Sequence, residues 1–201
     1  MTLRQSILKT VYPAFMTVNK WFGNKSAHAE NKQMAAPLQS FYDLHLVANS
    51  GNGIVMSYFK GKKILLVNTA SDCGYTAQLK ELQQLQNEYG NKLVIIGFPS
   101  NDFRQQEQGT DEQIEEFCKV NYGINFLLAK KSVVVKSAAQ NEVFKWLTDK
   151  TKNGWNEQPP QWNFSKYLVN EQGVLTNYFG PAISPVSKEI RQHLQPAKLI
   201  I

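Results

Sequence analysis

Residues 62–98 read KKILLVNTASDCGYTAQLKELQQLQNEYGNKLVIIGF, and this stretch decides the fold. Apolar runs at residues 64–67 and 93–98 are typical of short, buried central strands. The segment between them repeats apolar side chains at helical spacing: Leu79, Leu82, Leu85 and Tyr89. Gly90 and Asn91 then supply a stop signal. We therefore expect a strand–helix–strand unit in which the two strands run parallel.

The sequence around this unit adds a hairpin before it and a helix after it. Residues 42–47 and 54–58 flank a turn rich in Asn and Gly, a pattern that predicts a β-hairpin. Downstream, Thr110 with Gln113 three residues later predicts a capped helix that ends at Gly123.

The C-terminal part continues the alternation of strands and helices. A third helix is expected over residues 141–148, and two strands at residues 167–169 and 174–179. Ser184 as N-cap and Pro185 as first helical residue predict a last helix. In this order the elements predict an α/β chain with a thioredoxin-like fold, in which helices flank a central mixed β-sheet that follows an N-terminal β-hairpin.

The composition fits one globular domain with a short extension. Over 201 residues, 42% apolar and 11% aromatic content suffice for a full hydrophobic core. We expect the extension over residues 1–36 and the domain over residues 37–201. Most of the net charge of +6 lies in the extension, which has five basic residues and one acidic residue. The domain has no basic stripe interleaved with aromatic residues, so we expect no nucleic-acid partner.

Residues 1–36 mix apolar and basic side chains with no acid before Glu30, which is typical of an amphipathic segment on a membrane surface. No apolar run approaches the roughly 18 residues of a spanning helix. Two alternatives stay open: an export signal cleaved at the small-x-small pattern Ala27-His28-Ala29, and a poorly ordered tail. The cytoplasm is the expected compartment, with export or membrane association through this segment as alternatives.

The two cysteines, Cys73 and Cys118, are too few for a disulfide-stapled scaffold and form no C-x-x-C pair. The three histidines are scattered without ligand spacing: His28, His45 and His193. We therefore expect no metal and no cofactor.

Cys73 lies between the strand that ends near Asn68 and a helix expected to begin around Thr76. Unpaired N–H groups and the positive end of a helix favour the thiolate, which is the nucleophilic form. A dithiol oxidoreductase needs a second cysteine three residues later, where this chain has Thr76. A lone activated cysteine can attack an O–O bond and form a sulfenic acid, which another thiol must then reduce. These features predict peroxidase chemistry.

Three blocks of the sequence resemble the glutathione peroxidase family. They are VNTASDCGYT at residues 67–76, GFPSNDF at 97–103 running on to QEQG at 106–109, and WNFSKY at 162–167. The blocks follow the family's order, and the resemblance covers about residues 40–195. It implies a thiol-dependent peroxidase for hydrogen peroxide and organic or lipid hydroperoxides, regenerated by thioredoxin or glutathione.

The resemblance also implies a catalytic group made of Cys73, Gln106, Trp162 and Asn163. Cys73 is then the nucleophile that becomes a sulfenic acid. The side chains of the other three are donors that stabilise the thiolate and the charge that develops on the peroxide oxygens.

The chain departs from the family pattern at five positions. Ser100 stands where many members carry a further cysteine, so no second thiol is available there. Arg104 and Gln105 replace small glycines, and Gln108 and Leu127 replace prolines. These changes put the geometry of the loops in question, not the fold.

Cys118 lies on the helix that carries the resolving cysteine in thioredoxin-dependent members, one position earlier in the chain. Its neighbours Ile114 and Phe117 favour a packed core thiol, and both interpretations stay open. If Cys118 resolves Cys73, the helix must unwind locally, because a disulfide permits only about 7 Å between Cα atoms. Thioredoxin is then the natural reductant.

The connection from residues 145–147 to Trp162 lacks the longer segment of tetrameric, glutathione-using members, so we expect a monomer with an open site. No arginine cluster for the glutathione carboxylates accompanies Arg104, so glutathione specificity does not follow. Two other functions stay open. One is a redox sensor or relay that passes oxidation to a partner protein with little sustained turnover. The other is a thioredoxin-like binding module whose cysteine has an ordinary pKa.

Overall fold

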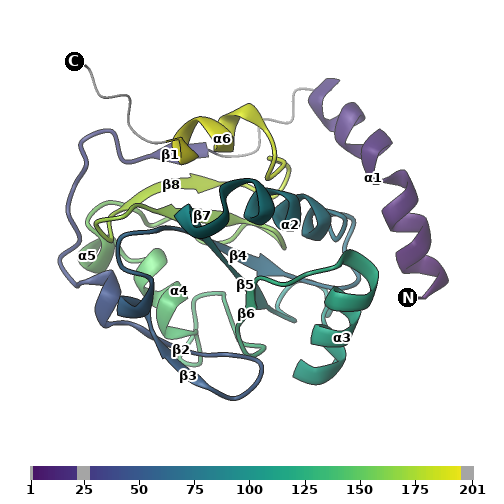
Figure 1. Cartoon of the computed structure of the whole chain (residues 1–201), viewed down its shortest axis with the longest axis horizontal. Helices are drawn as coiled ribbons and strands as arrows, with labels where there is room; N and C mark the ends of the chain where they lie inside the picture. Colours follow the sequence, from purple (N-terminus) through teal and green to yellow (C-terminus); the bar gives the residue numbers. More distant parts are fainter. Residues whose placement is uncertain (1, 22–27, 196–201) are drawn as a thin grey trace.

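The computed structural model describes residues 2–21 and 28–195 (Figure 1). A six-stranded sheet lies at its centre, with the strand order β1-β8-β7-β4-β5-β6. The strands are β1 (His28–Glu30), β4 (Lys63–Thr69), β5 (Leu93–Pro99), β6 (Leu127–Leu128), β7 (Lys166–Val169) and β8 (Leu175–Phe179). β4, β5 and β6 run parallel, whereas β4–β7, β7–β8 and β8–β1 are antiparallel pairs. The predicted mixed sheet and its central parallel pair are confirmed.

A separate two-stranded hairpin precedes β4. It pairs β2 (His45–Val47) with β3 (Gly53–Val55), which confirms the predicted hairpin with shorter strands. The expected second strand gives way at Met56 to a 3₁₀ helix, η2 (Met56–Phe59), and another, η1 (Phe41–Asp43), precedes β2. Met56 and Phe59 are both buried, and a 3₁₀ turn places residues three apart on one side, where a strand would point them to opposite faces.

The described residues also contain six α-helices: α1 (Leu3–Trp21), α2 (Gln78–Tyr89), α3 (Asp111–Tyr122), α4 (Glu142–Leu147), α5 (Lys150–Asn153) and α6 (Lys188–Leu194). A short 3₁₀ helix, η3 (Gly90–Lys92), follows α2. The capping box of Thr110 and Gln113 at α3 is confirmed, and α3 ends at Gly123 in the left-handed conformation.

The predicted start of the last helix is wrong. Ser187, not Ser184, precedes α6. The hydroxyl of Ser184 donates to Glu81 of α2 at 2.6 Å, and its carbonyl accepts the N–H of Ser187 at 3.0 Å. Ser184 therefore closes a turn and anchors it to α2 instead of capping a helix.

Side chains alternate along the sheet and divide the core into two layers. Leu65 and Val67 of β4 face the cluster that contains α2, α3 and α6, and Cys73 and Cys118 belong to the same cluster. Ile64 faces the opposite cluster, which contains α4 and the hairpin. Figure 1 shows the helices on both sides of the sheet. The site-bearing loops thus rest on the α2/α3 layer.

The N-terminal segment contributes two elements. α1 lies beside α2 and α3, outside the sheet (Figure 1). β1 pairs with β8 through His28 and Phe179, so residues 28–30 belong to the sheet although we expected an extension over residues 1–36. Ala27 of the expected cleavage pattern lies outside the described residues. Within residues 2–21 and 28–195, no helix is both long and apolar enough to span a bilayer.

Candidate active site

Cys73 lies in a run of turns between β4 and α2. α2 begins at Gln78, so the thiol precedes the helix by five residues and lies outside its first turn, later than the expected start around Thr76. Local hydrogen bonds hold it instead. The Cys73 N–H donates to the hydroxyl of Thr76 at 3.0 Å, and the Tyr75 N–H donates to Cys73 Sγ at 3.4 Å.

The thiol of Cys73 is almost fully enclosed, with 1% of the residue exposed. Burial raises the pKa of Cys73, because the thiolate loses its hydration. The Tyr75 N–H and the side chains of Trp162 and Asn163 act in the opposite direction and lower this pKa, whereas the charge of Asp72 raises it. In this resting arrangement burial outweighs the donors, so the expected preference for the thiolate is not present.

The structure brings the four predicted catalytic side chains together from three segments. Trp162 and Asn163 lie close enough to Cys73 to hydrogen-bond its sulfur. Asn163 Nδ2 donates to Gln106 Oε1 at 2.9 Å, and the Gln106 carbonyl accepts the N–H of Asp72 at 3.0 Å. Asn163 is fully buried, and its Oδ1 has no hydrogen-bond partner. The thiol therefore faces a cluster of donors beside one open acceptor.

Asn68, a residue that sequence reasoning did not single out, positions this cluster. It is fully buried at the end of β4. Its Nδ2 donates to the Trp162 carbonyl at 3.1 Å, and its Oδ1 accepts the Ser165 N–H at 3.0 Å. Phe164 within this turn has a φ of 67°, in the left-handed region. An asparagine that ends an apolar strand beside a reactive cysteine was the available sequence signal.

The loop that carries Gln106 retains the backbone that glycine would favour. Arg104 and Gln105 both have a φ of 52°, although neither is glycine. The guanidinium of Arg104 lies 5.6 Å from the centre of the Trp162 ring, a cation–π distance. Arg104 and Gln105 therefore occupy left-handed backbone positions that glycine adopts with less strain. Ser100 is fully buried, and its hydroxyl accepts the N–H of Asp102 at 3.3 Å.

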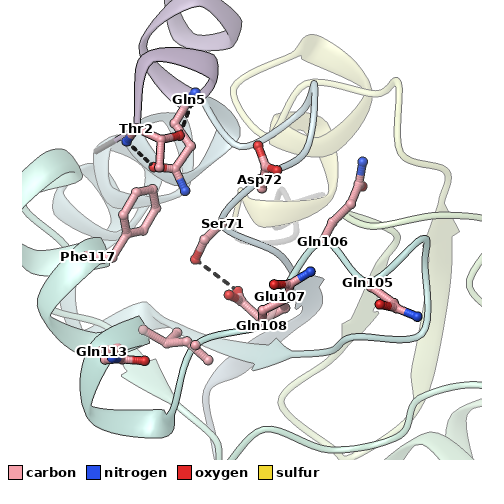
Figure 2. Close-up of a pocket in the computed structure, with 12 residues that line it drawn as sticks. Thr2, Gln5, Ser71, Asp72, Gln105, Gln106, Glu107, Gln108, Gln113 and Phe117 are labelled. Carbon is pink, nitrogen blue, oxygen red and sulfur yellow. Dashed lines mark hydrogen bonds between the residues drawn. The ribbon is translucent and has the colours of Figure 1, made fainter.

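A pocket of about 570 Å³ lies next to the Cys73 turn, between that turn, α3 and the start of α1. Figure 2 shows Glu107 directed toward Ser71 and Gln106 directed away from it. Glu107 is 2% exposed, and the Ser71 hydroxyl donates to its Oε2 at 3.0 Å. Burial raises the pKa of Glu107 to about 7, against the hydrogen bonds from Ser71 and the charge of Lys131, which lower it. Sequence reasoning missed this carboxylate, although it adjoins Gln106.

Cys118 is a packed thiol on α3. It is 3% exposed and belongs to the same apolar cluster as Cys73, and both thiols are free. Burial raises the pKa of Cys118 to about 12, and the charges of Glu107 and Glu115 add to this rise. At neutral pH the packed thiol therefore keeps its proton.

α1 forms polar contacts with the Cys73 turn and with the end of α3, the helix that carries Cys118. Arg4 forms an ion pair with Asp72 at 3.1 Å, and Asp72 directly precedes Cys73. Lys9 Nζ donates to the carbonyl of Asn121 at 3.0 Å and lies 4.7 Å from the centre of the Tyr122 ring, both at the end of α3. α1 therefore bridges the Cys73 turn and α3.

The histidines lie elsewhere. The rings of His28 and His193 are 6.0 Å apart at the sheet edge, and His45 lies on β2. Within the described part of the chain, no three His, Cys, Asp or Glu side chains gather in a way that could hold a metal ion.

Comparison with known proteins supplies the family. The model of the family "Glutathione peroxidase" matches residues 41–148. Glutathione peroxidase-like peroxiredoxin 2 of Saccharomyces cerevisiae is 40% identical over 149 residues, which cover 74% of this chain and 91% of the relative. The glutathione peroxidase homolog BsaA of Bacillus subtilis is 36% identical over 151 residues, which cover 75% of this chain and 94% of the relative.

Solved structures of other proteins share the fold of this chain. The crystal structure of Trgpx in its apo form superposes with a TM-score of 0.59 at 29% identity, covering 79% of this chain and 98% of that one. A DsbF homologue from Corynebacterium diphtheriae superposes with a TM-score of 0.58 at 14% identity, covering 86% and 92% of the two chains, and shares the fold alone. The predicted thioredoxin-like fold is confirmed, and the chain belongs to the glutathione peroxidase family.

Proposed function

We propose that this peroxidase reduces hydrogen peroxide and organic or lipid hydroperoxides through a sulfenic acid at Cys73. The Cys73 thiolate attacks the distal peroxide oxygen, the O–O bond breaks, and the departing alkoxide takes up a proton. The products are the sulfenic acid of Cys73 and an alcohol, or water when the substrate is hydrogen peroxide. The observation that carries this proposal is the placement of Trp162 and Asn163 beside the thiol, with the Asn163 amide bonded to Gln106.

Each of these three side chains has a role in the proposal. The Trp162 indole and the Asn163 amide donate to the sulfur and offset part of the penalty of burying a thiolate. Gln106 fixes the orientation of Asn163 through their 2.9 Å hydrogen bond. The unpartnered Oδ1 of Asn163 can accept the hydroxyl of an incoming hydroperoxide, which lowers the cost of leaving that oxygen buried.

Two routes can return Cys73 to the thiol. In the first, Cys118 attacks the sulfenic acid, and thioredoxin reduces the resulting Cys73–Cys118 disulfide. Because Cys118 is packed in the core at 3% exposure, this route requires local opening of α3. In the second, glutathione attacks the sulfenic acid directly and Cys118 stays a core thiol.

The chain acts as a monomer in this proposal, and because Cys73 is only 1% exposed, a bulky hydroperoxide reaches the thiol only when the loops around it open. The short connection between α5 and β7 supports this state, since it lacks an additional segment for subunit contacts. Molar mass in solution, measured by light scattering, tests it directly.

The proposal also places α1, as part of an extension over residues 1–36, on an anionic membrane surface. Its exposed apolar side chains form one stripe at positions i, i+4 and i+8: Leu3 is 80% exposed, Ile7 53% and Val11 47%. α1 has no acid in its first turn, and Arg4, which adjoins the stripe, keeps a side chain that is 67% exposed while it pairs with Asp72, so an anionic lipid surface is the complementary partner.

Sedimentation with vesicles of phosphatidylglycerol and phosphatidylcholine tests this contact. Val11→Glu should abolish binding, whereas Val47→Glu on β2 should leave it unchanged, because Val47 is equally exposed, at 46%, but lies on another surface. Equal behaviour of the two variants would rule α1 out. Deletion of residues 1–36 is a poor test, since it also removes β1 from the sheet.

Peroxide consumption with a thioredoxin system or with glutathione tests the enzyme itself. Wild type should turn over many equivalents and Cys73→Ser none. If Cys118→Ser loses turnover with the thioredoxin system but not with glutathione, the first route operates. Oxidation of wild type by a single equivalent without turnover would favour a redox sensor or relay instead.

A further inference from the structure

The indole of Trp162 meets a cation from the loop that carries Gln106. The guanidinium of Arg104 lies 5.6 Å from the centre of the Trp162 ring, within the distance of a cation–π contact. The ring of Phe103 lies 5.4 Å from the same indole and is tilted by 48° to it. Two consecutive residues of one loop therefore hold the aromatic side chain that hydrogen-bonds the sulfur of Cys73.

Arg104 has no competing partner in its own loop. Its side chain is exposed, and among the described residues no carboxylate forms an ion pair with it. The carboxylate of the neighbouring Asp102 instead accepts the N–H groups of Val134 and Val135 at 2.6 and 3.1 Å. The Trp162 ring is therefore the contact that fixes the guanidinium.

The backbone conformation of Arg104 disfavours any residue with a Cβ. Its φ of 52° lies in the left-handed region, which glycine adopts with less strain. Strained residues cluster where they position functional groups, although strain alone assigns no role. Here the strained residue ends on a ring that lies beside the reactive sulfur, so its side chain and not only its backbone matters to the site.

A cation on the face of an indole strengthens the indole N–H as a donor. The guanidinium attracts the π electrons of the ring, and the N–H bond becomes more polarised as the ring loses electron density. The indole nitrogen can only donate, and donation to a sulfur favours the thiolate over the thiol. The contact of Arg104 with Trp162 thus favours the nucleophilic form of Cys73 without any contact between the guanidinium and the sulfur.

We propose that Arg104 is a positioning residue that acts on Cys73 through Trp162: its guanidinium holds the indole in place and strengthens the N–H that donates to the sulfur. The inference deepens the proposed peroxidase function, on which it rests, and concerns the formation of the attacking thiolate. No loop has to move for this effect, because both ring contacts are present in the resting structure.

A double-mutant cycle between Arg104 and Trp162 tests the inference. Trp162→Phe keeps an aromatic ring for the guanidinium and removes the N–H. The rates of Cys73 alkylation by iodoacetamide and of its oxidation by hydrogen peroxide are measured against pH in the Cys118→Ser background. Below the pKa of the thiol, Arg104→Gln should slow both reactions by about two- to fivefold, the size of an exposed cation–π contact. In the presence of Trp162→Phe, the same change should alter the rates by less than about 1.5-fold.

Arg4→Gln is the matched control for charge. Arg4 pairs with Asp72 at 3.1 Å, and Asp72 directly precedes Cys73, so this variant also removes a cation near the thiol but not one on the indole. Its effect on the two rates should be the same with and without Trp162→Phe. Arg104→Lys keeps a cation at the ring and should react faster than Arg104→Gln.

Slowing by Arg104→Gln that persists in full beside Trp162→Phe would overturn the inference, because the cation would then act directly on the thiolate or the peroxide. Equal rates for the parent protein and Arg104→Gln, or for Arg104→Lys and Arg104→Gln, would overturn it as well. The two reactions also separate this inference from the proposed function. Coupling between Arg104 and Trp162 in alkylation, without any oxidation of Cys73 by peroxide, would support the inference and refute the peroxidase.

Discussion

Asn163 donates its side-chain amide to Gln106 Oε1 across 2.9 Å, and this bond joins two loops that are more than fifty residues apart in the chain. One loop precedes β7 and is held by Asn68, and the other follows β5. Since Asn163 also reaches the sulfur of Cys73, the amide is the point at which the loops and the thiol meet.

Replacement of Asn163 by Ala should therefore slow the oxidation of Cys73 by hydrogen peroxide by about 100-fold, the usual effect of removing one donor to a developing charge. Stopped-flow measurement of sulfenic acid formation provides the rate. Gln105→Ala is the control, because Gln105 is exposed in the same loop and has no hydrogen bond to the thiol. Equal rates for wild type and Asn163→Ala would remove Asn163 from the mechanism.

The pH dependence of Cys73 alkylation should report its enclosure. Because burial raises the pKa of Cys73 above its ordinary value of 9.0, the rate of reaction with iodoacetamide should still be rising at pH 9. Trp162→Phe removes one donor to the sulfur and should move the rise to higher pH. The measurement is made in the Cys118→Ser background so that one thiol reacts.

Trp155→Phe is the matched control, since the indole of Trp155 donates to the Leu175 carbonyl at 2.7 Å, in a different part of the molecule. A profile for Trp162→Phe that coincides with the Trp155→Phe profile would show that the indole does not stabilise the thiolate.

Cys118 should make the protein less stable at alkaline pH. Its pKa is about 12 in the folded chain and near 9.0 when unfolded, so between these values the unfolded chain loses a proton that the folded chain keeps. The free energy of unfolding should thus fall as pH rises from 9 toward 12, and the contribution is fully present below pH 9. Urea unfolding of wild type and Cys118→Ala should give curves that converge over this range. Parallel curves would contradict the burial of the thiol.

The unit at residues 62–98 was predictable because its signals are local. Apolar runs of strand length and the helical spacing between them need no distant partner to be recognised. The same holds for the capping box of Thr110 and Gln113, whose two hydrogen bonds lie within one turn. Local patterns of this kind determined most of the architecture.

The features that sequence missed depend on contacts between distant segments. β1 has three residues, too few for a periodic pattern, and forms because β8 offers it an edge. Ser184 has the identity of an N-cap, but Glu81 of α2 engages its hydroxyl. Glu107 resembles a solvated loop acid in sequence, and only the packing of α3 and the Cys73 turn around it raises its pKa. The candidate catalytic residues were found through a family resemblance, since nothing local distinguishes Trp162 or Asn163 from ordinary loop residues.

The loop before Gln106 should become more stable when glycine is restored. Gln105 has a φ of 52°, where a residue with a Cβ loses about 1–2 kcal/mol and glycine loses little. Glycine costs roughly 0.5–1 kcal/mol in additional chain entropy, so Gln105→Gly should gain between about 0 and 1.5 kcal/mol. Arg104 is a poorer site for this change, because its contact with the Trp162 ring would be lost. Gln108→Gly serves as the control: Gln108 is exposed in the same loop but does not have a positive φ, so glycine there should destabilise the protein. Denaturant unfolding measures both variants, and a loss of stability in Gln105→Gly would show that the backbone at this residue is not strained.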